Sequence, residues 1–224
     1  MAAEIASRGA EVEMALPRRG LETLLERVPL PPIPRNHPAI GKYRGKGSLS
    51  IGTTRDGILV GGVALPPEGP HHRIMTVHAG RGTNWATDEV VMLLQDGVRA
   101  VSKKMPGAVL PVGNMSRSGG GDIIWSISHN AGRDADIGFY LLDGKGRPFF
   151  ADVLVGLDAK GRGRVNGTTV RLDVRRMWLL AKAFVTHPAT RLQWMFVSDA
   201  LKKLIVEEGQ RRKEKPDVIA RVEA

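Results

Sequence analysis

The sequence predicts an α+β protein: a small antiparallel sheet flanked by helices, preceded by an extended Pro- and Gly-rich N-terminal arm. Short apolar runs typical of strands occur among amphipathic helical segments, without the regular spacing of a doubly wound sheet. The 27 glycines and 14 prolines among 224 residues indicate many turns and long loops. This length fits one large domain with an arm, and the absence of cysteine excludes disulfides and thiolate metal sites.

The arm is predicted to cover residues 1–47, and the folded domain residues 48–224. Four prolines in PLPPIPRNHP favour extended backbone, because each proline fixes φ and removes a hydrogen-bond donor. The basic, Gly-rich stretch GKYRGKG that follows is typical of a linker, which places the boundary near Lys46.

The first half of the domain is expected to contain a hairpin, two strands and a long helix. The hairpin joins residues 49–52 to 58–65 across TTRDG, and the strands cover 108–115 and 135–143. Along the second strand, side chains alternate between two faces. One face carries Ala135, Ile137, Phe139 and Leu141, and the other carries Asp134, Asp136 and Gly138.

The long helix is predicted to begin after Thr87, a good N-cap residue, and to end before Pro106-Gly107. Asp88 and Glu89 suit its first turn, where acidic side chains favour the positive end of the helix dipole. Its expected apolar face consists of Val90, Leu93, Leu94, Val98 and Val101.

The second half is expected to add a hairpin, a strand and three helices. The hairpin pairs residues 153–158 with 164–172 around the basic tip AKGRGR. A helix over 173–185 is expected to bury Met177, Leu180, Ala181 and Phe184, and a strand is expected over 191–198. Asp199 is expected to cap a helix that runs to about Glu208, and Pro216 to begin the last helix.

The formal net charge of +10 favours a polyanionic partner, namely nucleic acid, an anionic membrane face or acidic cell wall, with plain solubility as the alternative. The basic stretches GKYRGKG, AKGRGR and QRRKEK lack interleaved aromatic residues, so no nucleic-acid binding is expected. No apolar run is long enough to span a membrane, and no signal-peptide core is visible.

Among the six histidines, His129 has the best context for chemistry. It ends a Gly- and Ser-rich loop, and Asp136 follows seven residues later on the polar face of the predicted strand. A neutral imidazole and a carboxylate are a partial ligand set for Zn²⁺, while a His–Asp hydrogen bond between loop and strand is the alternative. His71, His72 and His78 are expected in a surface loop without a catalytic role.

The stretch VGNMSRSGGGDIIWSISHNAGRDADIGFYLLD closely resembles the penicillin-insensitive murein endopeptidases, a family of zinc peptidases. The wider group has the signature Ser-x-His, then Gly three residues and Asp seven residues after the His. Here Ser126 or Ser128 stands beside His129, with Gly132 and Asp136 following. The resemblance continues through LLDGKGRPF and RLQWMFVSDALKKLI and covers roughly residues 48–224.

The resemblance implies hydrolysis of the D-alanyl–meso-diaminopimelate cross-link between peptidoglycan stem peptides, in the periplasm or cell envelope. It implies a zinc cofactor, with His129 and Asp136 as two of three protein ligands and a zinc-activated water as nucleophile. Trp125 is either a stacking wall or a loop anchor, and a surface ion pair with Asp134 is the alternative role for Arg133. The residues expected to orient the substrate are Ser116, Arg117, Ser128 and Arg133.

The sequence departs from the family pattern in one respect. The pattern ends with His-x-His, which carries the third ligand and a catalytic histidine, and the 224 residues contain no His-x-His. The catalytic residues therefore stay unassigned, and we expect a C-terminally truncated domain with weak or no activity. A non-catalytic peptidoglycan-binding module is the alternative function, followed by a basic nucleic-acid-binding protein.

Overall fold

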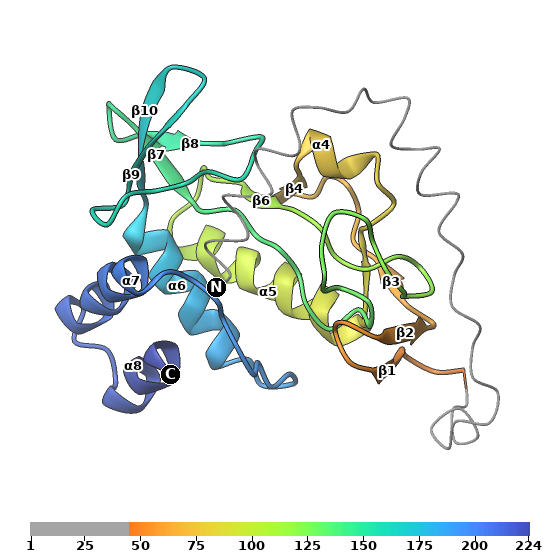
Figure 1. Cartoon of the computed structure of the whole chain (residues 1–224). Coiled ribbons are helices and arrows are strands. Elements are labelled where there is room, and N and C mark those ends of the chain that lie inside the picture. Colours follow the sequence, from red (N-terminus) through yellow and green to blue (C-terminus); the bar gives the residue numbers. More distant parts are fainter. Residues whose placement is uncertain (1–44) are drawn as a thin grey trace.

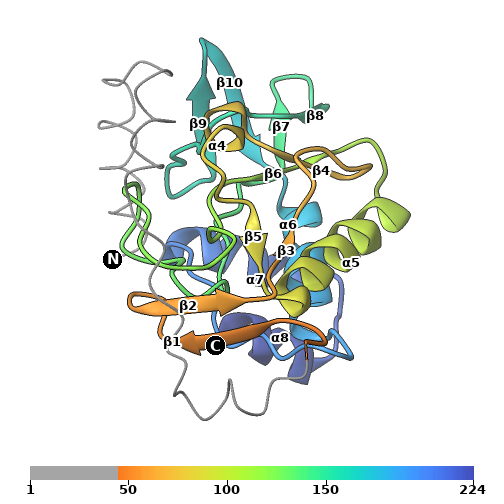
Figure 2. The same cartoon turned by 90° about the vertical axis from the view of Figure 1, so that its right-hand side faces the viewer.

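The structure, a computed structural model, describes residues 45–224 and has the expected α+β architecture. Helices form one layer, and a four-stranded antiparallel sheet projects from one end of it (Figures 1 and 2). Residues 1–44, which make up most of the predicted arm, lie outside the described residues, so the arm and its boundary stay predictions.

The long helix α5 (Asp88–Lys104) forms as its sequence predicts. The Thr87 hydroxyl accepts a hydrogen bond from the Val90 amide, and Lys103 and Lys104 lie in the last turn, where cations favour the negative end of the dipole. Leu93, Leu94, Val98 and Val101 are buried, and Val90 packs against the same core.

Three further helices complete the helical layer, with α6 (Val174–Val185) packed between α5 and α7 (Asp199–Arg211). Asp173 caps α6, and the predicted apolar face of α6 is buried. The α7 cap residue is Ser198 instead of Asp199, and α7 extends beyond Glu208. The helix α8 (Pro216–Glu223) begins at the expected proline.

The main sheet is antiparallel throughout, in the order β8-β7-β10-β9. Its strands are β7 (Leu141–Asp143), β8 (Pro148–Phe149), β9 (Arg162–Val165) and β10 (Thr168–Leu172). The predicted hairpin forms as β1 (Leu49–Gly52) and β2 (Gly57–Val60). The strands β3 (Val63–Ala64) and β5 (Trp85–Ala86) pair antiparallel, and β4 (His72–Ile74) and β6 (Leu110–Val112) form a parallel pair that the sequence did not predict.

The prediction of one strand over 135–143 is correct only for its end, where β7 forms. The preceding residues run alongside β6 and the two residues after it, joined by three backbone hydrogen bonds and by the isolated bridge between Val112 and Ile137, without forming a strand. The main antiparallel sheet therefore does not carry Asp136, which lies in the segment that leads into β7.

The predicted C-terminal hairpin is wrong in its pairing. Residues 153–158 form no strand, and β9 pairs with β10 across Asn166 and Gly167. Both turn residues have positive φ, 47° and 81°, which is the geometry for which Asn-Gly is the preferred two-residue turn.

The strand predicted over 191–198 is also absent. Its side chains alternate from Trp194 to Val197, since Met195 and Val197 pack against the core while Trp194 and Phe196 are exposed. Within residues 45–224, however, no backbone hydrogen bond joins residues 191–197 to another segment. Alternation alone does not make a strand when no neighbouring strand pairs with it.

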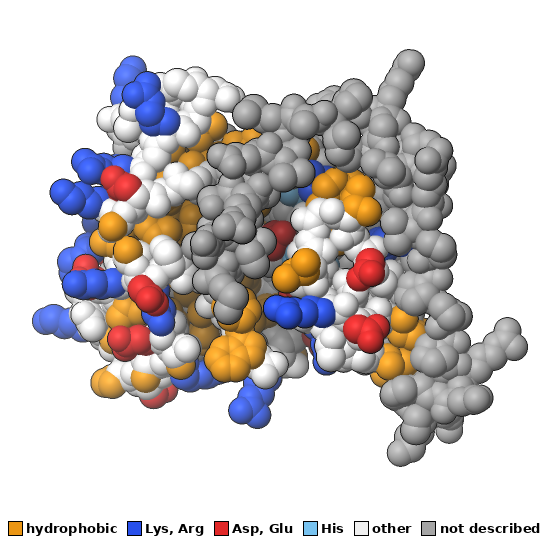
Figure 3. Space-filling model, viewed as in Figure 1, with side chains coloured by type: hydrophobic (Ala, Val, Ile, Leu, Met, Phe, Trp, Pro, Cys, Tyr) orange, Lys and Arg blue, Asp and Glu red, His pale blue; other side chains and the backbone are white. Residues whose placement is uncertain are grey.

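None of the helices in residues 45–224 combines the length and apolar character needed to cross a bilayer. Lys and Arg side chains gather over α7 and the β9–β10 hairpin on the face that Figure 3 shows. The exposed basic side chains of these elements include Arg162, Arg164, Lys203 and Arg211.

Packing of α6 against α7 leads to a stability prediction. A Cβ added at Gly209 would lie 2.5 Å from a ring carbon of Trp178, which is fully buried and has no room to move. Gly209→Ala gains about 1 kcal/mol of helix propensity but overpacks the core, at a cost of about 1–3 kcal/mol. We expect a net loss of thermal stability, measured as a lower Tm. Gly156→Ala, whose Cβ would meet no atom of residues 45–224 within 4 Å, is the control and should leave the Tm unchanged.

Candidate metal centre

The candidate site lies in the long loop between β6 and β7, which carries both His129 and Asp136 (Figure 1). Asp136 is fixed at the main chain: its amide donates to the Asn114 carbonyl, and its carbonyl accepts from the Gly113 amide, each at 2.8 Å. A Cβ at position 113 would lie 2.9 Å from the Asp136 Cβ. Glycine at 113 therefore permits the close approach that places the Asp136 carboxylate.

His129 has a strained backbone and a buried side chain. Its φ is +76°, a region that side-chain-bearing residues rarely adopt, and 2% of the residue is exposed. Such conformations persist only where the surrounding structure imposes them, and they cluster at functional sites.

Asn130 imposes much of this conformation by holding the loop against the β1–β2 hairpin. Its amide donates to the Thr54 carbonyl at 2.9 Å, and its side-chain Nδ2 donates to the Arg55 carbonyl at 2.8 Å and to an Asp122 oxygen at 2.5 Å. The neighbouring Gly132 carbonyl accepts from the Thr87 amide at the start of α5. The segment that follows His129 is thus fixed to two separate elements, the β1–β2 hairpin and the start of α5.

The imidazole of His129 lies between two carboxylates. Its Nε2 is 3.2 Å from Oδ2 of Asp136, within hydrogen-bond distance, and its Nδ1 is 2.9 Å from Oδ2 of Asp134. The contact with Asp134 is a close ion pair and is not aligned as a hydrogen bond. The expected His129–Asp136 pair therefore forms, and Asp134 joins it.

Burial of the ring disfavours its charged form, but the contacts with Asp134 and Asp136 outweigh this effect and raise the pKa of His129 to about 10. Without a metal ion, the two carboxylates therefore hold a proton on the imidazole at neutral pH. The site favours a cation between the ring and the acidic side chains.

The geometry fits two ligands of one zinc ion. Tetrahedral zinc with bonds of about 2.0–2.1 Å places neighbouring ligand atoms about 3.3 Å apart, close to the observed 3.2 Å between Nε2 and the Asp136 carboxylate. Within residues 45–224, no three or more His, Cys, Asp or Glu side chains are arranged to hold a metal ion. The described residues therefore supply an incomplete ligand set.

The side chains predicted to bind substrate have different surroundings. Ser116 is fully buried, its hydroxyl has no hydrogen-bond partner among residues 45–224, and its backbone pairs with Trp85. Arg117 is half-buried with an unpartnered Nη1 in the same part of the chain, and burial lowers its pKa. Ser128 contacts the Ser126 hydroxyl at 3.1 Å, and Arg133 donates to the Gly52 carbonyl. The roles of these four residues in substrate binding stay predictions.

Two buried polar residues, Arg81 and Asn114, link Trp125 to the main chain of Asp136. The Arg81 guanidinium lies 4.5 Å from the Trp125 ring centroid, and it also donates to the Asn114 side chain. The main-chain carbonyl of Asn114 in turn accepts a hydrogen bond from the Asp136 amide. The stacking on Arg81 accords with the anchor role for Trp125.

Sequence reasoning missed Asp134, Arg81 and Asn130 as parts of this site. Asp134 had a usable signal, since it shares the polar face of its segment with Asp136. The expected surface position of His72 and His78 is wrong: β4 and α4 (Thr76–Ala79) bury them to 5% and 3% exposure.

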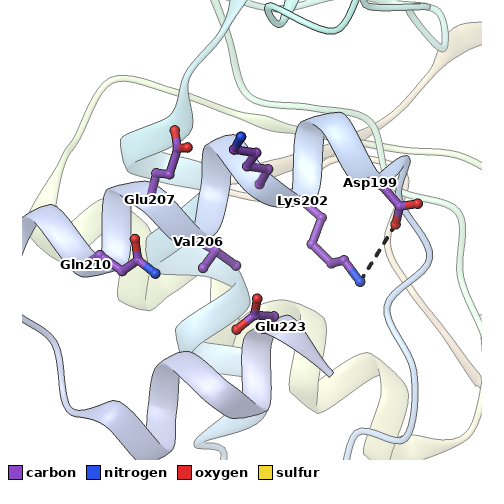
Figure 4. Close-up of a pocket in the computed structure, with 7 residues that line it drawn as sticks. Asp199, Lys202, Val206, Glu207, Gln210 and Glu223 are labelled. Atoms are coloured by element: carbon purple, nitrogen blue, oxygen red, sulfur yellow. Dashed lines mark ion pairs between the residues drawn. The ribbon is translucent and has the colours of Figure 1, made fainter.

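A hollow of about 390 Å³ lies elsewhere, between α7 and α8 (Figure 4). Asp199, Lys202, Glu207 and Glu223 line it, and the Lys202 ammonium is paired with the Asp199 carboxylate one turn away. None of the candidate site residues belongs to this hollow.

Comparison with known families identifies the class of protein. Residues 50–214 match the family model described as penicillin-insensitive murein endopeptidase, which makes this chain a peptidase. The chain belongs to the penicillin-insensitive murein endopeptidase family, and the family activity is cleavage of cell-wall peptidoglycan. No curated protein sequence matches the chain significantly.

The raised pKa of His129 predicts a pH dependence of the metal-free protein. Because the folded-state pKa of about 10 lies above the ordinary value of 6.5, the stabilisation is complete below pH 6.5 and is lost as pH rises toward 10. Chelator-treated wild type should therefore exceed His129→Gln in free energy of unfolding at pH 7, and the difference should shrink by pH 10. Urea unfolding measures both proteins, and a constant difference would contradict the assignment.

The bracing role of Asn130 predicts a loss of stability in Asn130→Ala. The substitution removes the Nδ2 group and with it the hydrogen bonds to the Arg55 carbonyl and the Asp122 carboxylate, at a cost of about 1–3 kcal/mol in urea unfolding. Asp122→Ala removes only one of these bonds, at an exposed side chain, and should cost less. Equal losses in the two variants would argue against bracing by the Arg55 contact.

Proposed function

We propose that this chain is a zinc-dependent peptidoglycan endopeptidase that cleaves D-alanyl–meso-diaminopimelate cross-links, with His129 and Asp136 as zinc ligands. The observation that carries the proposal is the buried His129 imidazole, whose Nε2 lies 3.2 Å from the Asp136 carboxylate within a murein endopeptidase domain. The alternative structural role, a hydrogen bond alone, does not account for a second carboxylate on the same ring.

Exposure favours the Asp136 side of the imidazole as the metal position. The Asp136 side chain is 40% exposed, so a substrate and a water can approach it. Zinc bound there would supply a water of lowered pKa for attack on the scissile carbonyl and would polarise that carbonyl. His129 and Asp136 would hold the ion, and the fixed Asp136 main chain would keep the carboxylate in place when substrate enters.

Arg117 supplies a donor suited to a substrate carboxylate. Its Nη1 has no hydrogen-bond partner among residues 45–224, and meso-diaminopimelate carries a carboxylate that would satisfy it. Ser128 and Arg133 lie on the same loop as His129, and Ser116 would act through the loop because it is buried.

Charge and location accord with this substrate. The net charge of +10 suits an anionic cell wall, and the family activity on peptidoglycan supports a location in the cell envelope. We propose the periplasm as its compartment. No nucleic-acid partner is proposed.

A non-catalytic peptidoglycan-binding module is the second candidate. It is favoured by one observation: within residues 45–224, only two donors, His129 and Asp136, lie at the metal position. Such a module would use the same site to hold a stem peptide without hydrolysing it.

Zinc-loaded protein and purified sacculi distinguish the two functions. An endopeptidase should release soluble peptides newly cut at D-alanyl–meso-diaminopimelate bonds, and a chelator should abolish release. His129→Ala and Asp136→Ala should reduce release to background, since each removes a ligand. The matched control Asp56→Asn changes an exposed carboxylate of the β1–β2 turn and should retain activity. Protein that pellets with sacculi and releases nothing is a binding module.

A further inference from the structure

Asp134 places a second carboxylate on the ring that Asp136 already contacts. The two residues are separated by Ala135, which packs toward the core, so both acidic side chains leave the same side of an extended segment. Asp136 reaches Nε2, and Asp134 reaches Nδ1 at 2.9 Å. One imidazole is therefore held by a carboxylate on each of its nitrogens.

The buried position of the Asp134 carboxylate lowers the stability of the fold unless the contact with His129 compensates for it. Its Oδ1 is buried without a hydrogen-bond partner among residues 45–224, and only 30% of its side chain is exposed. An unsatisfied buried carboxylate oxygen costs stability, and such groups in native proteins call for an explanation. Apart from the adjacent ring, no cationic side chain of the described part is paired with this carboxylate.

Two differences assign distinct roles to the carboxylates. The 3.2 Å approach of Asp136 to Nε2 matches the spacing of two ligands on one tetrahedral ion, whereas Asp134 approaches Nδ1 more closely, at 2.9 Å. The Asp136 side chain is also the more exposed of the two, at 40% against 30% for Asp134. Asp134 faces Nδ1, which is buried.

We propose that Asp134 is a positioning residue whose carboxylate, facing Nδ1 of His129 at 2.9 Å, turns Nε2 toward the metal position. This inference rests on the proposed function, because it assumes that His129 is a ligand. A carboxylate on the far nitrogen of a ligating histidine fixes its tautomer and ring orientation and makes it a stronger ligand. Asp134 acts through His129 and touches neither the metal nor the substrate.

The direct test is zinc affinity, measured by isothermal titration of the purified chain with zinc alone. Asp134→Asn keeps the shape of the side chain but removes its charge, and we expect Kd to rise about 10- to 100-fold. Asp134→Ala should be at least as weak, and it replaces the first variant if that one does not fold. Asp56→Asn removes the same charge from the exposed β1–β2 turn and should leave Kd unchanged.

Two results of the titration would overturn the proposal. Unchanged zinc affinity in Asp134→Asn would show that the carboxylate does not support the ligand. A complete loss of binding, equal to that of Asp136→Ala, would make Asp134 a ligand itself. A graded loss, smaller than that of Asp136→Ala, supports a positioning role.

A readout without metal separates this inference from the proposed function. Wild type that binds no zinc would contradict the proposed function. Crystal structures of metal-free wild type and Asp134→Asn would then still test the positioning role. We expect the His129 ring to rotate in the variant and to lose its 3.2 Å contact with Asp136. A ring that keeps its orientation would overturn the inference.

Discussion

An imidazole held between two carboxylates is the interaction on which the β6–β7 loop depends. His129 is buried, and burial alone would favour its neutral form. Asp134 and Asp136 reverse that preference, so the centre of the loop is a position for positive charge. The raised pKa of His129 favours a proton on the ring in the metal-free protein, and a divalent ion on Nε2 would contact Asp136 while Asp134 stays on Nδ1.

The surrounding main chain keeps these side chains in place. Asp136 is hydrogen-bonded on both sides to the segment after β6, and Asn130 joins the loop to the β1–β2 hairpin. The φ of +76° at His129 and the close approach at Gly113 show that the backbone adopts a conformation few residues tolerate. Rigid support of this kind is what a ligand pair needs, because a small displacement changes coordination geometry.

The helices were predictable because their signals are local. Thr87 caps α5 and Pro216 begins α8, each within a few residues of the turn it starts. The strand over 191–198 was not, because its alternation describes one segment while a strand requires a second. The C-terminal hairpin failed for a related reason: the local Asn166-Gly167 turn overrode the longer pairing that apolar runs suggested.

By itself the sequence determined the α+β class, the helical layer and the pairing of His129 with Asp136, because caps, periodicity and the family motif are properties of neighbouring residues. Only the tertiary structure decided what surrounds that pair. It set Asp134 against Nδ1 and buried the ring. Those contacts depend on how β1–β2, α5 and β6 pack around the loop, and distant segments leave no local signal in the chain.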